Sequence, residues 1–239
     1  LIKTNREAMQ YIKEPSLLKD MKAFNQQERN HFECHRRVNE LLKKNGYPQF
    51  ERIEQYYKAS YERLKKRSLR TRLAYSAGFE TMTKGFTNFV ICKRSQLWVG
   101  ADKHMTTFWL MHLLEEGEHK TVAFDVYMAY SGKYLPRAIG VLHGTYHVIW
   151  LALIAMFSAL KRDCLLTKPK TFFMILKEFS FLSWNVFPYI FYALLPWHDP
   201  RSFEDPEWML EWIEGYKEQE EKQSIPLLDT NNPRIPVPF

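Results

Sequence analysis

The stretch that decides the fold is residues 108–127, FWLMHLLEEGEHKTVAFDVY. Between Phe108 and His119 the residue that disfavours a helix is Gly117, which costs about 1 kcal/mol relative to alanine. On a helix with about 100° per residue, four potential metal ligands share one arc of roughly 100°: His112, Glu115, Glu116 and His119. Because the other positions are mostly apolar, we expect this helix to be buried. Buried carboxylates and imidazoles are costly unless they are paired or bind a metal, so the stretch predicts a metal-binding face.

A second stretch, residues 27–35 (QERNHFECH), carries a similar pattern. Glu28 and His31 are three positions apart and His35 follows one turn later, so on a helix the three side chains span about 60°. Two Glu-x-x-His helices that face each other are the building unit of di-iron and di-manganese carboxylate bundles. A polar helix face in water is the alternative for this stretch alone, and the residues leave both interpretations open.

The composition excludes a globally disordered chain and favours helices. The 239 residues are 46% hydrophobic and 15% aromatic, enough for a large core, while glycine is scarce and strand-like alternation is rare. We therefore predict an all-α protein. The formal net charge of +7 permits an anionic partner without identifying one. Three widely spaced cysteines form no disulfide framework and favour a reducing, cytoplasmic compartment.

Three further helices are predicted, over residues 16–45, 48–67 and 68–92. Ser16 is the expected N-cap of the first. Glu80 stands in the apolar middle of the third, either as a metal ligand or as a surface glutamate paired with Lys84 one turn later. Residues 58–72 are strongly basic and form either a solvated helix end or a patch for a membrane surface or another anion. No nucleic-acid-binding motif accompanies them, so we expect no nucleic acid partner.

Two apolar segments follow, at residues 137–160 and 171–197, and both are long enough to cross a bilayer core of about 30 Å. The basic loop KRDCLLTKPK between them argues against a two-span hairpin with a cytosolic body. We therefore expect helices that pack in the core or dip into a membrane surface. His143 and His147 share a helix face, and they either line a pocket, add a metal ligand or are satisfied core histidines.

Three regions are expected, forming one continuous domain. Residues 1–133 form the metal-binding helical bundle, and residues 134–200 form the apolar hairpin, core-packed or membrane-associated. Residues 201–239 comprise a charged amphipathic helix at 207–222 and a proline-rich tail.

The motifs resemble a bacterial family of predicted metal-dependent hydrolases. The matching residues are QE-x-x-H-x-x-x-H at 27–35, FE at 79–80 and H-x-x-EE-x-EHK-x-x-AFD-x-Y at 112–127, with a later segment around His198 and Pro200. The family's ligand pattern is similar to that of ferritin-like di-iron proteins. The resemblance therefore implies a ferritin-like helical bundle with additional apolar C-terminal helices.

The resemblance also implies an order of ligands along the chain. Glu28 and His31 would come from the second bundle helix, Glu80 from the third, and Glu116 and His119 from the fourth. The sequence departs from the family pattern in two places. Thr81 stands where the family has a histidine after the third-helix glutamate, and the first-helix glutamate would lie at or before residue 1. His35, His112 and Glu115 add to the minimal ligand set.

The function expected from these residues is a dinuclear metal enzyme. The leading hypothesis is an O2-dependent oxidase or oxygenase with two iron ions, manganese or zinc being alternatives, that acts on a hydrophobic or lipid-like substrate. Asp125 and Tyr127 are candidates for orienting a ligand or moving protons. An electron donor protein, a membrane surface and a second copy of the chain are the expected partners, in the cytoplasm or at the inner membrane. A two-metal hydrolase of an ester or phosphate and a non-enzymatic metal-binding bundle are the alternatives.

Overall fold

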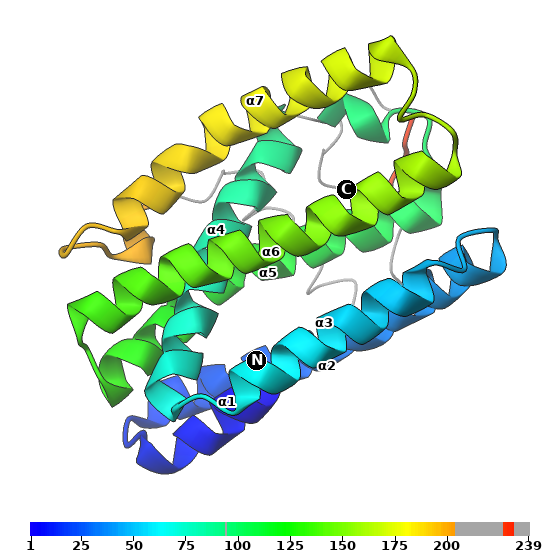
Figure 1. The fold of residues 1–239 in the computed structure, drawn as a ribbon. Coiled ribbons are helices and arrows are strands. Elements are labelled where there is room, and N and C mark those ends of the chain that lie inside the picture. The colour runs from blue at the N-terminus through cyan, green and yellow to red at the C-terminus, as the bar shows by residue number, and fades with distance from the viewer. Residues whose placement is uncertain (94, 204–226, 232–239) are drawn as a thin grey trace.

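The structure is a computed structural model that describes residues 1–93, 95–203 and 227–231 (Figure 1). The part of the chain that it describes contains helices and no strands, which confirms the all-α prediction. The helices are α1 (Ile2–Ala8), α2 (Pro15–Lys44), α3 (Phe50–Lys65), α4 (Leu69–Lys93), α5 (Lys103–Tyr130), α6 (Tyr134–Arg162) and α7 (Pro169–Ala193). Three short 3-10 turns join them: η1 (Met9–Tyr11), η2 (Ser95–Trp98) and η3 (Pro200–Ser202).

The helix ends follow local chemistry, with one correction. Helix α2 begins at Pro15, so the prediction that Ser16 is its N-cap is wrong. Proline is well suited to the first helical position because its missing N–H would have no helical partner there. The Ser16 hydroxyl instead donates to a Glu14 carboxylate oxygen at 2.7 Å. At α5 the expected chemistry does hold, since the Asp102 carboxylate accepts from the Met105 backbone N–H at 2.9 Å.

Helix α4 is the centre of the bundle and packs against α5, α6 and α7 (Figure 1). Its closest neighbour is α6, because glycines let the two backbones touch. A Cβ atom placed on Gly140 would overlap the backbone carbonyl of Ala74, and one placed on Gly144 would lie 2.8 Å from the Phe79 nitrogen. This contact fixes the position of α4, which carries Glu80.

Two clusters of buried apolar side chains lie along α5. One joins α1, α2, α4 and the end of α5 around Met21, Leu73 and Tyr127. The other joins the end of α4 and the beginning of α5 around Ile91 and Leu110. The carboxylates and imidazoles of α5 from Glu115 to His119 lie between the residues that α5 gives to these clusters. Apolar packing on both sides therefore holds this polar segment in place.

The apolar helices α6 and α7 differ from ordinary core helices. Helix α6 is long and apolar enough to cross a membrane, yet only 28% of its most apolar window is buried. Length and composition alone are weak evidence for a span. In α7 the buried residues are Thr171, Val186 and Ala193. The sequence left two alternatives for the apolar hairpin, packing in the core or association with a membrane. Packing in the core does not describe α7.

The C-terminal region is described only in part. The predicted amphipathic helix at 207–222 lies outside the described residues, as does most of the proline-rich tail. The described piece packs against the beginning of α5. The Leu228 backbone N–H donates to the Thr107 hydroxyl at 3.0 Å, and the Gly100 backbone N–H donates to the Thr230 carbonyl at 2.9 Å.

Candidate metal centre

Eight predicted ligands come together from three helices. Helix α2 supplies Glu28, His31 and His35, helix α4 supplies Glu80, and helix α5 supplies His112, Glu115, Glu116 and His119. The two Glu-x-x-His pairs face each other across the α2–α5 interface, as the sequence patterns predict. The solvent-face alternative for residues 27–35 does not describe His31, which is buried.

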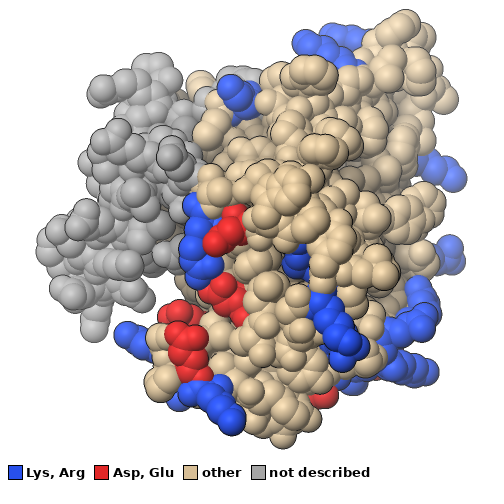
Figure 2. Space-filling view, turned by 90° about the vertical axis from the view of Figure 1, so that its left-hand side faces the viewer, with Lys and Arg blue, Asp and Glu red and all other residues tan. Residues whose placement is uncertain are grey.

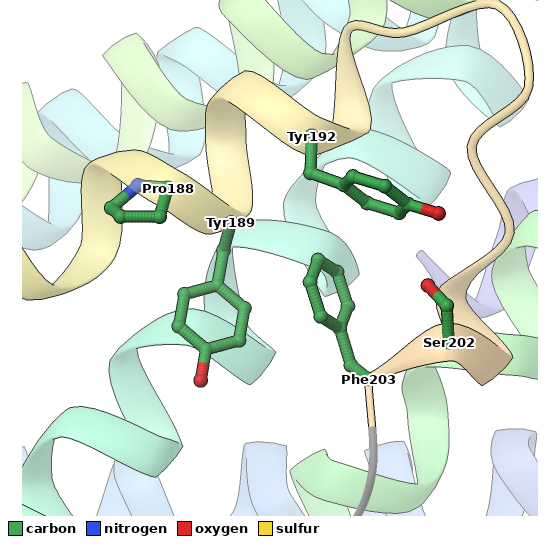
Figure 3. Close-up of a pocket in the computed structure, with 5 residues that line it drawn as sticks. All are labelled: Pro188, Tyr189, Tyr192, Ser202 and Phe203. Atoms are coloured by element: carbon green, nitrogen blue, oxygen red, sulfur yellow. The ribbon is translucent and has the colours of Figure 1, made fainter.

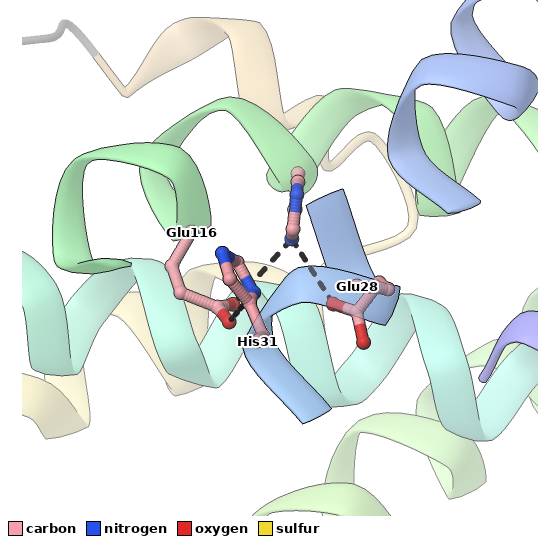
Figure 4. A group of neighbouring side chains, drawn as sticks. Glu28, His31 and Glu116 are labelled. Carbon is pink, nitrogen blue, oxygen red and sulfur yellow. Dashed lines mark ion pairs between the residues drawn. The ribbon is translucent and has the colours of Figure 1, made fainter. Parts of the chain in front are cut away.

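The core of the site is formed by one pair from each helix. One ligand atom each from Glu28, His31, Glu116 and His119 lies within 4.8 Å of all the others. The histidines contact the glutamates of the opposite helix: His119 Nδ1 is 3.2 Å from Glu28 Oε1, and His31 Nδ1 is 3.2 Å from Glu116 Oε1. Figure 4 shows Glu28, His31 and Glu116 pointing toward one another from α2 and α5. Four donors at this spacing could surround a single cation.

A second group of donors adjoins the first. His31 Nε2 lies 2.7 Å from Glu115 Oε2, and His112 Nε2 lies 3.2 Å from Glu116 Oε1. His35 Nε2 is 3.3 Å from His112 Nε2, so its ring extends the group toward Trp109. Both His31 and Glu116 therefore contact members of both groups. This arrangement offers ligand atoms for two neighbouring cations rather than one.

Glu80 lies at the buried base of the site. Its side chain is 0% exposed, and one of its oxygens is 3.9 Å from His119 Nδ1. Lys84 is also completely buried, so the alternative of a Glu80–Lys84 pair on the helix surface is wrong. Neither Glu80 oxygen has a hydrogen-bond partner within the described chain. A carboxylate in such surroundings needs a cation or a proton.

The orientation of His119 is fixed by Gln27, a role that the sequence patterns did not reveal. His119 Nε2 lies 3.2 Å from Gln27 Oε1. Because an amide oxygen can only accept, Nε2 carries the proton, and in the neutral ring Nδ1 presents a lone pair. That lone pair faces carboxylates of Glu28, Glu80 and Glu116. One feature of the sequence could have pointed to Gln27. This residue lies four positions before His31, which places it on the ligand-bearing side of α2.

Several buried polar atoms at the site lack hydrogen-bond partners in the described chain: His31 Nδ1, His112 Nδ1, His119 Nδ1, Glu116 Oε2 and both Glu80 oxygens. Buried polar atoms are nearly always satisfied, so a group of unsatisfied ones requires an explanation. A bound cation would satisfy those that face the centre. Carboxylate and imidazole donors without thiolates suit iron, manganese or zinc. The residues present therefore fit a metal centre.

The charges of the site shift the pKa values of its members. Burial opposes protonation of His31, but the hydrogen bond with Glu115 and the close Glu116 carboxylate outweigh it and raise its pKa to about 9. Burial likewise opposes protonation of His119, yet the close carboxylates of Glu116 and Glu28 raise its pKa above the ordinary value. Burial and the neighbouring Glu116 charge raise the pKa of Glu80. Without a metal, protons shared among these side chains therefore stabilise the cluster. Metal binding must release those protons.

The site opens toward solvent on one side. The Glu115 side chain is 31% exposed, whereas that of His119 is 1% exposed. Aromatic rings flank this open side: Phe108 stacks on His112, and Trp109 packs against His35. Glu115 therefore lies at the accessible edge of the site, while Glu80 and His119 are buried.

Asp125 and Tyr127 have partners away from the ligands. Asp125 pairs with Arg201, with a 3.0 Å contact to one guanidinium nitrogen, and the Tyr127 hydroxyl donates to the Lys133 carbonyl at 2.5 Å. These contacts hold the end of α5 and the loop that follows it. They do not orient a ligand histidine, so the role proposed for these two residues from the sequence gains no support.

The α6 histidines also lie apart from the ligands. His147 Nδ1 is 2.7 Å from the Tyr75 hydroxyl, and its Nε2 is 2.9 Å from the Ser60 hydroxyl. His147 is therefore a satisfied histidine, one of the predicted alternatives. His143 is exposed, and its ring packs against Tyr75 with a centroid distance of 5.1 Å.

A pocket of about 530 Å³ lies elsewhere, between the end of α7 and η3 (Figure 3). Pro188, Tyr189 and Tyr192 project into it from α7, and Ser202 and Phe203 close it from the other side. None of these five residues is a predicted ligand. The metal centre and this pocket are therefore separate features of the described chain.

Two departures from the expected ligand pattern are visible. The Thr81 hydroxyl donates to the Ala77 carbonyl at 2.9 Å, so it satisfies the helix backbone instead of replacing the expected histidine. The beginning of α1 lies near the site, because the Leu1 backbone nitrogen is within electrostatic range of Glu28 and Glu80. A ligand at or before residue 1 stays a prediction.

Fold and site together define a helical bundle with a buried carboxylate–imidazole cluster suited to metal binding. The chain belongs to the family described as predicted metal-dependent hydrolase, whose model matches residues 1–204 and thus includes all eight clustered side chains. This confirms the resemblance seen in the motifs. Comparison with curated proteins and with solved structures finds no match.

Proposed function

We propose that this protein is a dinuclear metal enzyme whose ions are bound between α2, α4 and α5. The observation that carries the proposal is the pair of facing Glu-x-x-His motifs with the partnerless Glu80 beside them. The first ion would be held by Glu28, His119 and Glu80, and the second by His31, Glu115 and His112. Glu116 lies near the histidines of both sets and would offer its carboxylate as a ligand to either ion.

We further propose iron as the metal and O2-dependent oxidation as the reaction. Four carboxylates and four imidazoles form a donor set that suits iron, as well as manganese. Two bound ferrous ions would supply two of the four electrons that reduction of O2 to water requires, and the substrate or an electron donor protein would supply the other two. The protein's own part is to keep the deep end of the site dry, to hold Glu115 at the open edge, and to offer the rings of Phe108 and Trp109 to a hydrophobic substrate.

The second candidate is a two-metal hydrolase, which the family description favours. In that case the ions would lower the pKa of a water molecule and polarise an ester or phosphate. In this candidate Glu115 would serve as the general base and not as a metal ligand, because it is the most exposed of the cluster's ion-paired carboxylates. The chain offers no GxSxG, P-loop or HExxH motif, so a hydrolytic reaction would depend on the metal ions.

Metal content tests the shared part of both candidates. We expect about two ions per chain in the purified protein, measured by mass spectrometry, and almost none in the Glu116→Ala/His119→Ala variant. The matched control is Glu33→Ala/Arg36→Ala, which removes an exposed ion pair from the same α2 helix. Equal metal content in all three proteins, with intact folding by circular dichroism, would contradict the proposal.

Reaction tests separate the candidates. An iron-loaded protein that consumes O2 after reduction and loses this activity in the double variant supports oxidation. A zinc- or manganese-loaded protein that cleaves a nitrophenyl ester or phosphate under anaerobic conditions supports hydrolysis. Retention of metal without either activity would identify a non-enzymatic metal-binding bundle.

A further inference from the structure

Helix α7 exposes a nearly continuous apolar surface. Its large exposed side chains are Phe172, Phe173, Met174, Leu176, Phe179, Trp184, Phe187 and Phe191. The most exposed is Trp184, at 81%. Helices that are apolar on all sides are normally buried in a core or in lipid. Isolated apolar residues on a surface need no explanation, but a contiguous row of aromatic rings indicates a docking surface.

Helix α6 also exposes apolar side chains. Leu135, Ile139, Leu142, Tyr146 and Trp150 recur at helical spacing and are all exposed. Because α6 packs on α4 through its glycines, these side chains lie on the side of α6 that α4 leaves free. The hairpin thus presents apolar side chains from both of its helices.

Basic side chains surround the beginning of this surface. Lys161 and Arg162 end α6, Lys168 and Lys170 begin α7, and Lys177 follows two turns later; all five are exposed. The acidic residues nearby are Asp163, which accepts hydrogen bonds from the Tyr47 hydroxyl, and Glu178. In Figure 2, basic side chains and no acidic ones are visible among the described residues at the top of the molecule.

We infer that α7 and the α6–α7 loop dock on an anionic lipid bilayer, with the α7 rings in the interface and the lysines on the headgroups. Exposed tryptophan and phenylalanine next to lysine and arginine form the combination that binds such surfaces. Each basic group close to an anionic leaflet adds to the attraction, which salt weakens. A second copy of this chain carries the same charge of +7 and would be repelled at the same basic loop.

This inference goes beyond the proposed function and does not depend on it, because none of the docking residues is a metal ligand. It concerns binding to the surface and requires neither helix to cross the bilayer. The docked surface would place the protein within reach of membrane-soluble molecules. Failure of metal binding and failure of docking are consequently separate outcomes in separate experiments.

Vesicle flotation of the full chain tests the inference. We expect the protein to float with vesicles that contain phosphatidylserine in phosphatidylcholine and to bind pure phosphatidylcholine vesicles at least about tenfold more weakly. Trp184→Ser/Phe187→Ser should weaken binding to the anionic vesicles by at least about tenfold, because it removes apolar insertion. Lys168→Glu/Lys170→Glu should do the same and should abolish most of the salt dependence.

Matched controls distinguish docking from general changes in charge or hydrophobicity. Lys19→Glu/Lys22→Glu alters the net charge equally on exposed positions of α2, and Tyr11→Ser removes an exposed ring from η1. Both controls should bind like the wild type. Absence of vesicle binding by the wild type, or equal binding by all variants, would overturn the inference. So would a wild-type dimer, seen by light scattering, that the Trp184→Ser/Phe187→Ser variant converts to a monomer.

Discussion

His119 Nδ1 lies 3.2 Å from Glu28 Oε1, while the Nε2 atom of the same ring is 3.2 Å from Gln27 Oε1. Neighbouring residues of α2 thus contact opposite ends of one imidazole of α5. Gln27 fixes which nitrogen carries the proton, and Glu28 faces the nitrogen that is left to bind a metal. One turn of α2 therefore supplies both a ligand and the group that orients another ligand.

Replacement of Gln27 tests this relationship. We expect Gln27→Leu to lower metal affinity by about 10- to 100-fold, because hydrogen bonds that orient a ligand histidine contribute that much. The fold should persist, since leucine is similar in size and suits a helix. A competition titration with a chelator measures the affinity. The control is Gln26→Leu, at an exposed position one residue earlier; unchanged affinity in Gln27→Leu would show that Gln27 does not orient the ligand.

The stability of the metal-free protein should depend on pH in a defined direction. The pKa of His31 is raised in the fold from 6.5 to about 9, because the hydrogen bond with Glu115 and the close Glu116 carboxylate outweigh the effect of burial. The resulting stabilisation is fully present below pH 6.5 and is lost as the pH rises through 9. The raised pKa values of His119 and Glu80 act in the same direction.

Thermal unfolding of chelator-treated protein measures this dependence. We expect the free energy of unfolding to fall by on the order of 2 kcal/mol across that range. His31→Gln should reduce the fall. Added metal should bind more tightly as the pH rises, because the same protons must leave. Metal-free protein whose stability rises over this range would contradict the assignment of protons to the site.

The close contact of α4 with α6 at Gly140 predicts that alanine there destabilises the protein, although helix propensity alone would predict stabilisation. Gly140→Ala forces a Cβ atom against the Ala74 carbonyl, which is backbone and cannot move alone. We expect destabilisation by about 1–3 kcal/mol in urea unfolding. Gly85→Ala is the milder comparison, because its Cβ would meet Tyr189 Cβ and Cγ at 3.1 Å, a contact that a shift of a few tenths of an ångström relieves. Both changes gain the same helix propensity, so equal stabilities would refute the close contact.

The ion pair of Asp125 with Arg201 predicts a structural and not a catalytic role. Asp125→Asn should leave metal content and turnover unchanged and should cost at most about 1 kcal/mol of stability, because the pair is partly exposed. Glu115→Gln is the informative comparison, since it alters a carboxylate that contacts His31 directly. Loss of metal in Asp125→Asn would restore the role that its place in the sequence motif suggested.

Much of the fold followed from local chemistry. Proline and glycine positions predicted where the helices end to within a few residues, and the scarcity of glycine and of strand-like alternation predicted an all-α chain. The prediction at Ser16 was wrong because serine occurs both at the N-cap and in the first helical turn. Pro15 is well suited to the first helical position, so the helix begins one residue before Ser16. The sequence also did not decide whether Glu80 is a buried ligand or a surface residue. A glutamate and a lysine one helical turn apart have the same spacing whether the helix face is exposed or buried.

The ligand set was predictable because it depends on helical spacing within single segments. Glu28 with His31, and Glu116 with His119, each lie one turn apart on one helix face, whatever the helix packs against. Gln27, in contrast, acts across the interface on a histidine of another helix. No spacing within α2 could assign that partner, because it depends on how α5 is rotated about its axis.

By itself, the sequence determined that this protein is helical and that two of its helices carry carboxylates and imidazoles on one face, because helix geometry converts spacing directly into direction. Only the tertiary structure decided that these faces meet, that Glu80 is sealed beneath them and that α7 remains exposed. Such contacts join residues far apart in the chain. They follow from backbone approach at Gly140 and from packing around α4, which no local pattern contains.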